Sequence, residues 1–337
     1  MISELDLKII HALQISPRVD WGTLASVLGV SAPTLARHWD AMRDAGIAWV
    51  TPSPGPRYLD AGWSAFVYLT STPSLQEELV ERLCLNPAFA TVMLVSGPHD
   101  LVVDCYASSY DKLLHTMTES FANLPGLVHR EVVFATAIHR GVDAWRSGTL
   151  EPGQVRQLTA PVGARAVGGH APDAVDTRLV AALADDGRAS WAHLGAECGV
   201  SAQTAKRRIE RILTAGYLSL RCDAAMEIGA GQREVTLLLT APAASVDAIG
   251  AYVAGLPGCR LNAGLLGPAN LLVTLWVHDF SEVHDLELEL GRRAPECTVV
   301  SREATVRHYK RAGRLLDARG RSRGRVPMPL WQAETVA

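Results

Sequence analysis

Residues 20–47 read DWGTLASVLGVSAPTLARHWDAMRDAGI, and residues 190–217 read SWAHLGAECGVSAQTAKRRIERILTAGY. The two stretches lie 170 residues apart, and 14 identical pairs join residues 6–46 to residues 176–216 without a gap. Later pairs keep the same spacing, as when Gly97 meets Gly267 and Pro98 meets Pro268. A repeat of this length indicates a duplicated unit of two parts rather than a solenoid of short repeats.

Each copy begins with the pattern of three short helices. The second and third helices are joined by a glycine turn and a serine cap, at Gly29-Val30-Ser31 and at Gly199-Val200-Ser201. Two helices joined in this way form a helix-turn-helix. We therefore expect helix-turn-helix domains at residues 1–50 and 174–220, with a plain helical bundle as the alternative.

The rest of each copy alternates between strand and helix patterns. The order is strand, helix, two hairpin strands, helix and strand, which is the ferredoxin-like arrangement. The expected fold class is thus α+β, with ferredoxin-like βαββαβ effector and dimerisation domains at residues 63–146 and 233–313. A linker rich in Gly, Pro and Ala is expected at 147–173, and a basic flexible tail at 314–337.

The bulk composition is that of an ordinary globular chain, with 337 residues, 48% apolar residues and 20% charged ones. A net charge of −3 gives no overall attraction to DNA, so any DNA contact must come from local patches. The apolar runs are strand-sized and no export signal opens the chain, so we expect a cytoplasmic protein without membrane contact. Six scattered cysteines predict neither disulfides nor a metal site, and no cofactor is expected.

A basic face marks the third helix of the second copy. At about 100° per residue, its polar side chains lie opposite the buried stripe, as in helices that read the major groove. The expected DNA contacts in this copy are Ser201, Gln203, Thr204, Lys206, Arg207, Arg208 and Arg211. The first copy is weaker, because Asp40 and Asp44 would repel phosphates; its expected contacts are Ser31, Thr34, Arg37 and His38. A solvated charged helix face is the alternative.

These motifs carry a resemblance to a known family. Leu5-Asp6, Gly29-Val30-Ser31 and Ala45-Gly46-Ile47, followed by a ferredoxin-like unit, resemble the leucine-responsive/asparagine (Lrp/AsnC) transcription regulators. Members of that family carry one such pair of domains, dimerise through the C-terminal units and often respond to amino acids. The resemblance implies a DNA-binding regulator in which one chain acts as a covalent pseudo-dimer. It also implies double-stranded DNA as partner and self-association into a dimer or tetramer of two-copy chains.

The same resemblance implies a small-molecule effector site, with an amino acid as one class of effector. The family's Gly-x-x-Asp turn corresponds to Gly97-Pro98-His99-Asp100 and, with the acid replaced, to Gly267-Pro268-Ala269-Asn270. The expected effector-binding residues are Gly97, His99, Asp100, Gly267 and Asn270. A plain hairpin turn, with Asp chosen for its geometry, is the alternative.

Catalytic motifs are lacking in the sequence, and we expect no enzyme. There is no Gly-x-Ser-x-Gly elbow and no phosphate-cradling glycine loop. No His/Arg constellation for a polycarboxylate substrate stands out in the expected strands. The alternative hypothesis is an enzyme that resembles the siroheme decarboxylases, with an active-site cleft between the ferredoxin-like domains and vestigial helix-turn-helix units.

Overall fold

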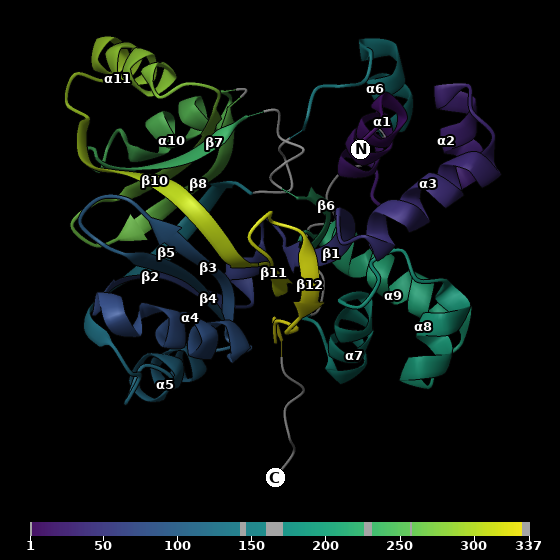
Figure 1. Cartoon of the computed structure of the whole chain (residues 1–337), viewed down its shortest axis with the longest axis horizontal. Helices are drawn as coiled ribbons and strands as arrows, with labels where there is room; N and C mark the ends of the chain where they lie inside the picture. The colour runs from purple at the N-terminus through teal and green to yellow at the C-terminus, as the bar shows by residue number, and fades with distance from the viewer. Residues whose placement is uncertain (1, 142–145, 160–170, 226–230, 257, 332–337) are drawn as a thin grey trace.

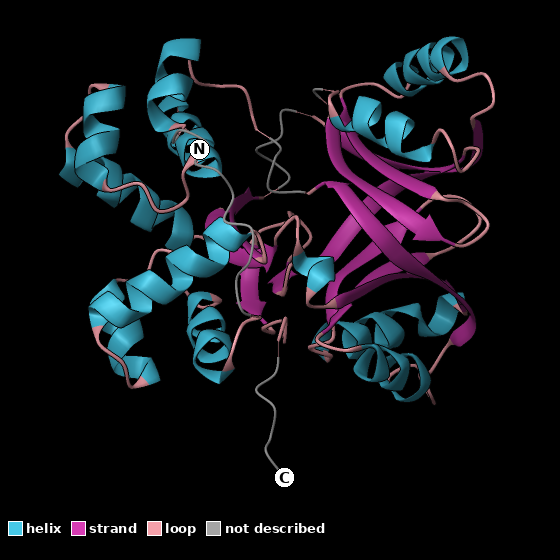
Figure 2. Cartoon of the chain, turned by 180° about the vertical axis from the view of Figure 1, so that it is seen from behind, coloured by secondary structure: helices cyan, strands magenta, loops and turns pink. Residues whose placement is uncertain are grey.

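The computed structural model describes the chain except for residues 1, 142–145, 160–170, 226–230, 257 and 332–337. The described residues form a mixed α+β molecule with two bodies, one mostly helical and one built around strands (Figure 1). Seen from behind, the strands of the second body form its centre and the helices flank them on the outside (Figure 2). No helix in the described ranges is both long and apolar enough to cross a bilayer.

The helical body consists of two three-helix units, each followed by a strand. The first head comprises α1 (Glu4–Ile15), α2 (Trp21–Leu28), α3 (Ala32–Asp44) and β1 (Ala48–Pro54). The second head comprises α7 (Ala174–Leu183), α8 (Trp191–Cys198), α9 (Ala202–Ala215) and β6 (Leu218–Ala224). The two heads share one hydrophobic core, so they fold as a single body.

Local capping sets the helix ends where the sequence predicts them. The hydroxyls of Ser31 and Ser201 accept hydrogen bonds from the backbone N–H groups of Thr34 and Thr204, which satisfies a free donor at the start of α3 and of α9. Gly29 and Gly199 end the preceding helices with φ of 68° and 71°. This left-handed conformation favours glycine, because a Cβ would be strained there.

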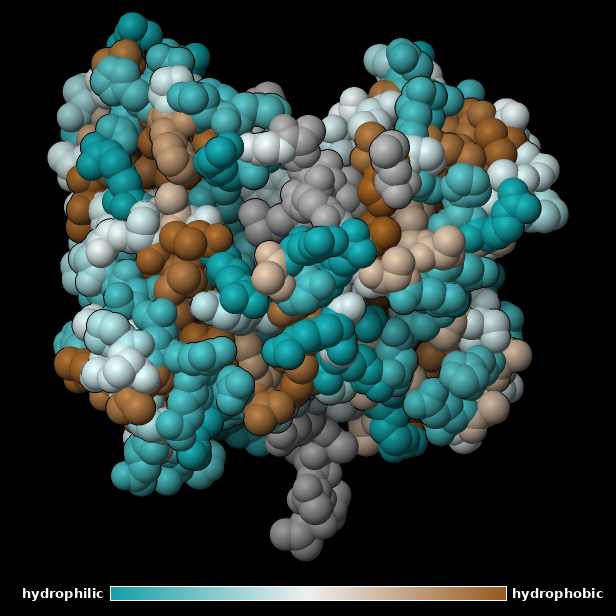
Figure 3. All heavy atoms as spheres, viewed as in Figure 1, coloured by the Kyte–Doolittle hydropathy of each residue, from teal (hydrophilic) through white to brown (hydrophobic). Residues whose placement is uncertain are grey.

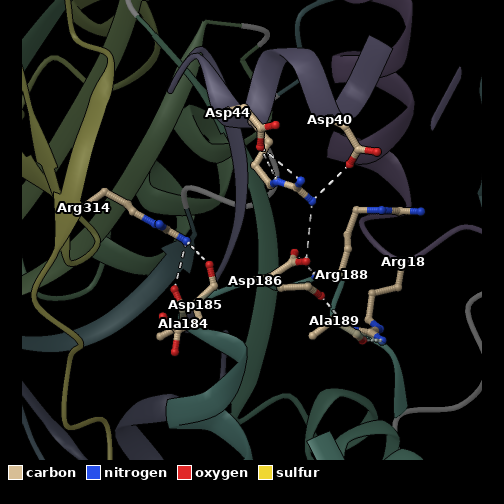
Figure 4. Close-up of polar contacts among 11 residues, drawn as sticks. Arg18, Asp40, Asp44, Ala184, Asp185, Asp186, Arg188, Ala189 and Arg314 are labelled. Atoms are coloured by element: carbon tan, nitrogen blue, oxygen red, sulfur yellow. Dashed lines mark hydrogen bonds and ion pairs between the residues drawn. The ribbon is translucent and has the colours of Figure 1, made fainter. Parts of the chain in front are cut away.

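The two heads are joined by reciprocal hydrogen bonds from two equivalent arginines. The Arg18 guanidinium donates to the carbonyls of Gly187 and Ala189 at 2.5 and 2.6 Å, and Arg188 donates to those of Pro17 and Val19 at 2.7 and 2.8 Å. Figure 4 shows Arg18, Arg188 and Ala189 at this junction. Strands β1 and β6 add an antiparallel pair between the heads, from Ala48↔Ala224 to Pro54↔Leu218. These contacts fix the heads relative to each other.

The strand-rich body contains two units with the same order of elements. The first α/β unit comprises β2 (Trp63–Ser71), α4 (Gln76–Leu85), β3 (Phe89–Val95), β4 (Leu101–Ala107), α5 (Tyr110–Glu119) and β5 (Leu127–Arg140). The second comprises β7 (Arg233–Thr240), α10 (Val246–Ala254), β8 (Cys259–Leu266), β9 (Leu271–Val277), α11 (Ser281–Arg293) and β10 (Thr298–Arg311). Short 3₁₀ turns lie at Tyr58–Asp60 (η1) and Pro73–Leu75 (η2).

The last strand of each unit is long and crosses into the other unit. Strand β5 pairs with β2 of its own unit over residues 127–134 and then with β8 over 134–140. Strand β10 pairs with β7 over residues 298–304 and then with β3 over 305–310. The eight strands therefore close into a ring, which removes the exposed sheet edges and creates an enclosed interior.

The segments expected to be a linker and a flexible tail are more ordered than predicted. In the linker, residues 152–158 form α6 (Pro152–Leu158), and Leu150 and Leu158 are buried against the heads. In place of a tail at 314, the chain forms β11 (Arg314–Leu316) and β12 (Ser322–Arg325). The basic composition misled the prediction, because Arg314 and Arg325 of this segment bond to protein groups.

Residues 314–331 form a strap between the two bodies. The Arg314 guanidinium donates to the carbonyls of Ala184 and Asp185 at 2.9 and 2.8 Å (Figure 4). Arg325 pairs with Asp185, and the buried Leu330 and Trp331 pack into the core of the heads. On the face drawn in Figure 3, hydrophobic residues form separate groups among hydrophilic ones.

Candidate active site between the two α/β units

A cavity of about 90 Å³ lies inside the closed ring of strands. Apolar side chains from both units make part of its wall, among them Phe66, Met93 and Leu272. Charged and polar side chains make the rest of the wall. They include Tyr68, Asp104, Arg221, Glu234, Arg260, Glu303, His308 and Arg311. A concave, partly apolar pocket with a few convergent polar groups is the usual form of a small-molecule site.

Two arginines and two carboxylates form a buried network at this cavity, and a third arginine, Arg311, acts electrostatically on both carboxylates. Arg221 pairs with Asp223, which also lies 3.3 Å from the Arg260 guanidinium. Arg260 reaches Glu234 at 3.7 Å. Each of these four side chains is at least nine-tenths buried. Burial makes such a network costly to assemble, so it is weak evidence for stability.

The network keeps its carboxylates ionised. Burial disfavours the charge on Glu234, but His308 at 3.3 Å, Arg260 and Arg311 hold its pKa below the usual range. Because burial also lowers the pKa of His308, the two arginines are the permanent charges in this balance. Burial also opposes the charge on Asp223, yet Arg221 leads the neighbours that lower its pKa. Three guanidinium groups thus face two firmly ionised acids, which leaves positive charge at the cavity wall.

Several polar atoms at the cavity have no hydrogen-bond partner within the described part of the chain. They are the Tyr68 hydroxyl, one carboxylate oxygen each of Asp104 and Glu303, Nε of Arg221, both ring nitrogens of His308, and Nε and Nη2 of Arg311. Buried polar groups are nearly always satisfied, so a cluster of unsatisfied ones at a cavity points to a bound ligand or water. Burial raises the pKa of Asp104 to about 7.

The charged groups belong mainly to one half of the chain. Positions 170 residues earlier hold neutral residues: Arg221 corresponds to Thr51, Glu234 to Ser64, Arg260 to Ala90, His308 to Ile138 and Arg311 to Gly141. In exchange, Asp104 of the first half corresponds to Thr274. The expectation that no His/Arg constellation lies in the strands is therefore wrong. The overlooked signal is the set of charged residues inside second-half strands where the first half is uncharged.

The residues expected to bind an effector lie at the two hairpins that follow β3 and β8. The Asp100 carboxylate accepts hydrogen bonds from the backbone N–H and the hydroxyl of Ser71, at 2.7 and 3.1 Å. Asn270 makes the equivalent contacts with Ala241, accepting from its N–H at 3.0 Å and donating to its carbonyl at 2.6 Å. Both side chains thus tie a hairpin to the end of a neighbouring strand.

The other expected effector-binding residues, Gly97, Gly267 and His99, differ in their surroundings. Gly97 has φ of 108°, the left-handed conformation that favours glycine. Gly267 has the Val133 side chain beside it. His99 is the member closest to the cavity wall, because its Nδ1 lies 3.3 Å from the Glu303 carboxylate.

The residues expected to contact DNA from α9 fall into two groups. Ser201, Gln203, Lys206 and Arg207 are exposed, and Thr204 is half-buried beside its cap. Arg208 and Arg211, in contrast, pair with the carboxylate of Asp176, a fully buried residue on α7; Arg208 does so at 3.1 Å. Arg208 also pairs with Asp173 at 2.7 Å. The free cationic face of α9 is therefore narrower than the sequence indicates.

The first head has the matching arrangement with fewer charges. His38 Nδ1 lies 2.8 Å from the Asp6 carboxylate, as Arg208 lies beside Asp176. Ser31 and Arg37 are exposed, and Thr34 is half-buried. Arg43 contacts Asp40 and Asp44 on the same helix at 3.1 Å and Asp186 of the second head at 4.0 Å.

Comparison with known proteins gives two kinds of match. Residues 173–212 match the AsnC-type helix-turn-helix domain. A crystal structure of the siroheme decarboxylase NirDL covers 92% of this chain and 93% of its own, with 15% identity and a TM-score of 0.56. The same enzyme in co-complex with an iron-uroporphyrin III analogue gives the same coverage, with 13% identity and a TM-score of 0.55. No curated protein matches the chain in sequence.

A structure of an Lrp/AsnC-type regulator also matches, over a smaller part of the chain. The structure of AsnC from E. coli covers 40% of this chain and 93% of its own, with 20% identity and a TM-score of 0.35. The expectation that the chain is not an enzyme is contradicted, because the structures that share its fold over 92% of its length are those of an enzyme. The sequence misled us because catalytic motifs of the kinds sought were absent, whereas the buried network needs no local motif.

Proposed function

We propose that the chain is an enzyme that removes carboxyl groups from a polycarboxylate tetrapyrrole bound between its two α/β units. The observation that carries this proposal is the buried cavity with three guanidinium groups and unsatisfied polar atoms. The full-length likeness of fold to siroheme decarboxylase supports it. On this view the two halves are copies of one ancestral unit, fused into a pseudo-dimer whose ferredoxin-like domains enclose one site.

The chemistry of the cavity suits such a substrate. Guanidinium groups bind carboxylates through paired hydrogen bonds, and Arg311 has two nitrogen atoms without a partner in the described residues. A cavity of about 90 Å³ holds only part of a macrocycle, and apolar side chains such as Phe66 and Leu272 offer a surface for that part. The carboxylates that pair with the guanidinium groups anchor the substrate, whereas one held against the apolar part of the wall loses its hydration, which favours its departure as neutral carbon dioxide.

The test is direct turnover. The full chain is incubated with siroheme without oxygen, and the products are separated and weighed by mass spectrometry. Successive losses of carbon dioxide support the proposal. Unchanged siroheme, together with no absorbance shift when iron-uroporphyrin III is added, contradicts it.

The second candidate function is DNA binding by the second head. It is supported by the match of residues 173–212 to an AsnC-type domain and by the exposed Lys206 and Arg207 on α9. In this role the chain is a cytoplasmic regulator, with an amino acid or other small metabolite as effector and further self-association of chains. Gel shifts with DNA fragments selected from a random pool test it, and sequence-indifferent binding would contradict a specific regulator.

A further inference from the structure

We propose that Asp104 is the catalytic residue that protonates the substrate carbon when a carboxyl group leaves; this inference rests on the proposed function. Asp104 lies on β4 and contributes to the cavity wall. Its Oδ1 has no hydrogen-bond partner in the part of the chain that the structure describes. An acid in this position can hold a proton toward the cavity without giving up another contact.

Two other acids at the cavity, Glu234 and Asp223, pair with arginines, which hold them as anions. Glu303 also has one oxygen, Oε2, without a partner in the described residues. Its Oε1, however, lies 3.3 Å from His99, which opposes the rise in pKa that burial causes. The hydroxyl of Tyr68 is a poor acid there, because burial raises its pKa well above the ordinary value. Asp104 is therefore the best-placed proton donor among these groups.

The surroundings of Asp104 keep its proton available near neutral pH. Burial raises its pKa to about 7, against a hydrogen bond from Thr91 on β3 that lowers it. Glu234 on β7 raises the pKa further and Arg221 on β6 lowers it. Tyr68 on β2, Tyr106 on β4 and both Glu303 and His308 on β10 also line this cavity. The two tyrosines keep their protons, burial raises the pKa of Glu303, and burial lowers that of His308. A general acid works best when its pKa lies near the working pH.

The step balances without an oxidant or a reductant. The bond between the side-chain carbon and the carboxylate carbon breaks, and carbon dioxide leaves. The electron pair that stays on the side-chain carbon takes the proton from the Asp104 carboxyl. Water then returns a proton to the Asp104 carboxylate, so each cycle replaces one carboxylate by one hydrogen.

The test separates binding from proton transfer. Asp104→Asn keeps the size and shape of the side chain but removes the acid, and Asp111→Asn makes the same change at an exposed position on α5. Both variants are titrated with iron-uroporphyrin III by absorbance and assayed for turnover of siroheme. We expect Asp104→Asn to bind within about threefold of the parent and to lose about 10²–10⁴-fold in kcat. Asp111→Asn should match the parent in both measurements.

The pH profile gives an independent readout. In the parent, kcat/KM should fall as the pH rises through about 7, because Asp104 of the free enzyme then loses the proton that it must donate. Asp104→Glu, which restores an acid, should recover part of kcat with a displaced profile. Turnover by Asp104→Asn near the parent level would overturn the assignment while leaving the proposed function intact. A parent chain that leaves siroheme unchanged would instead overturn the proposed function itself.

Discussion

At the scale of single residues, Arg311 is the cation most available to a ligand. It ends β10, is 3% exposed and has two nitrogen atoms without a hydrogen-bond partner in the described ranges. Arg311→Ala should weaken the binding of iron-uroporphyrin III by about 2–5 kcal/mol, because a buried charge contact to a carboxylate is lost. An absorbance titration measures the change.

The matched control for Arg311 is Arg302→Ala on the same strand. Arg302 is exposed and pairs with Glu287 at 2.6 Å on the outside of the barrel. The Arg302→Ala variant should bind iron-uroporphyrin III with the same affinity as the parent. If both variants bind iron-uroporphyrin III as the parent does, the cavity is not the tetrapyrrole site.

The stability of the fold should also report on Asp104. Its pKa in the folded chain, about 7, lies above the value of an unfolded Asp, so the free energy of unfolding that it contributes is highest in acid and is lost as the pH rises through about 7. Asp104→Asn cannot ionise. We therefore expect it to gain about 1–4 kcal/mol over the parent between pH 4 and pH 8.

Urea unfolding at several pH values measures this difference. The free energy of unfolding of Asp104→Asn should exceed that of the parent by an amount that grows with pH up to about 7 and then levels off. A difference that does not change with pH would mean that the Asp104 carboxyl is not buried as an acid. A more stable but inactive variant is the usual result when a strained or desolvated catalytic group is replaced.

At the scale of elements, α9 divides its arginines between two tasks. Arg207 is exposed and makes no ion pair within the described residues, whereas Arg208 pairs with Asp173 and Asp176. Arg207→Ala should cost about 1–3 kcal/mol in DNA affinity if α9 reads a base edge. Arg208→Ala should instead lower the free energy of unfolding by about 1–3 kcal/mol, because the buried Asp176 carboxylate loses a partner.

Gel shifts and thermal unfolding of the two α9 variants distinguish these outcomes. Arg37→Ala on α3 is the equivalent change in the first head, at the position 170 residues before Arg207. If none of the three variants binds DNA differently from the parent, neither head reads DNA. The heads would then have a structural role, as the part of the enzyme that packs beside the cavity.

At the scale of the whole molecule, the two halves have similar folds but contribute different residues to the cavity between them. Arg260, His308 and Arg311 have uncharged counterparts in the first half, so only one half supplies this part of the cavity. We expect isothermal titration to give one bound iron-uroporphyrin III per chain. Two equivalent sites per chain would mean that the ligand binds outside this cavity, because the halves offer no second copy of the charged wall.

The heads and the site are also joined through the strap. Met328 contributes to the cavity wall, while Leu330 and Trp331 pack into the core of the heads a few residues later. The Tyr58 hydroxyl, in the connection between β1 and β2, lies 3.0 Å from the carbonyls of both Ala107 and Leu330. The composition of this segment, basic and rich in glycine, does not reveal these contacts.

The sequence alone determined the helices of the heads and their limits. The serine caps, the turns at Gly29 and Gly199 and the helical spacing of apolar residues act within a few positions of each other. Such signals are readable because neighbours in sequence are neighbours in space. The strand and helix order of the α/β units follows from the same kind of local pattern.

Only the tertiary structure decided the site. The crossing of β5 and β10 closes the barrel, and it brings together Asp104 and the second-half residues Arg221, Glu234, Arg260, His308 and Arg311. Strand pairings between residues more than 100 positions apart leave no periodic trace in the sequence, because either face of a strand can become the interior. The charged residues of those strands could be assigned to a site only once the closed barrel showed which face of each strand is buried.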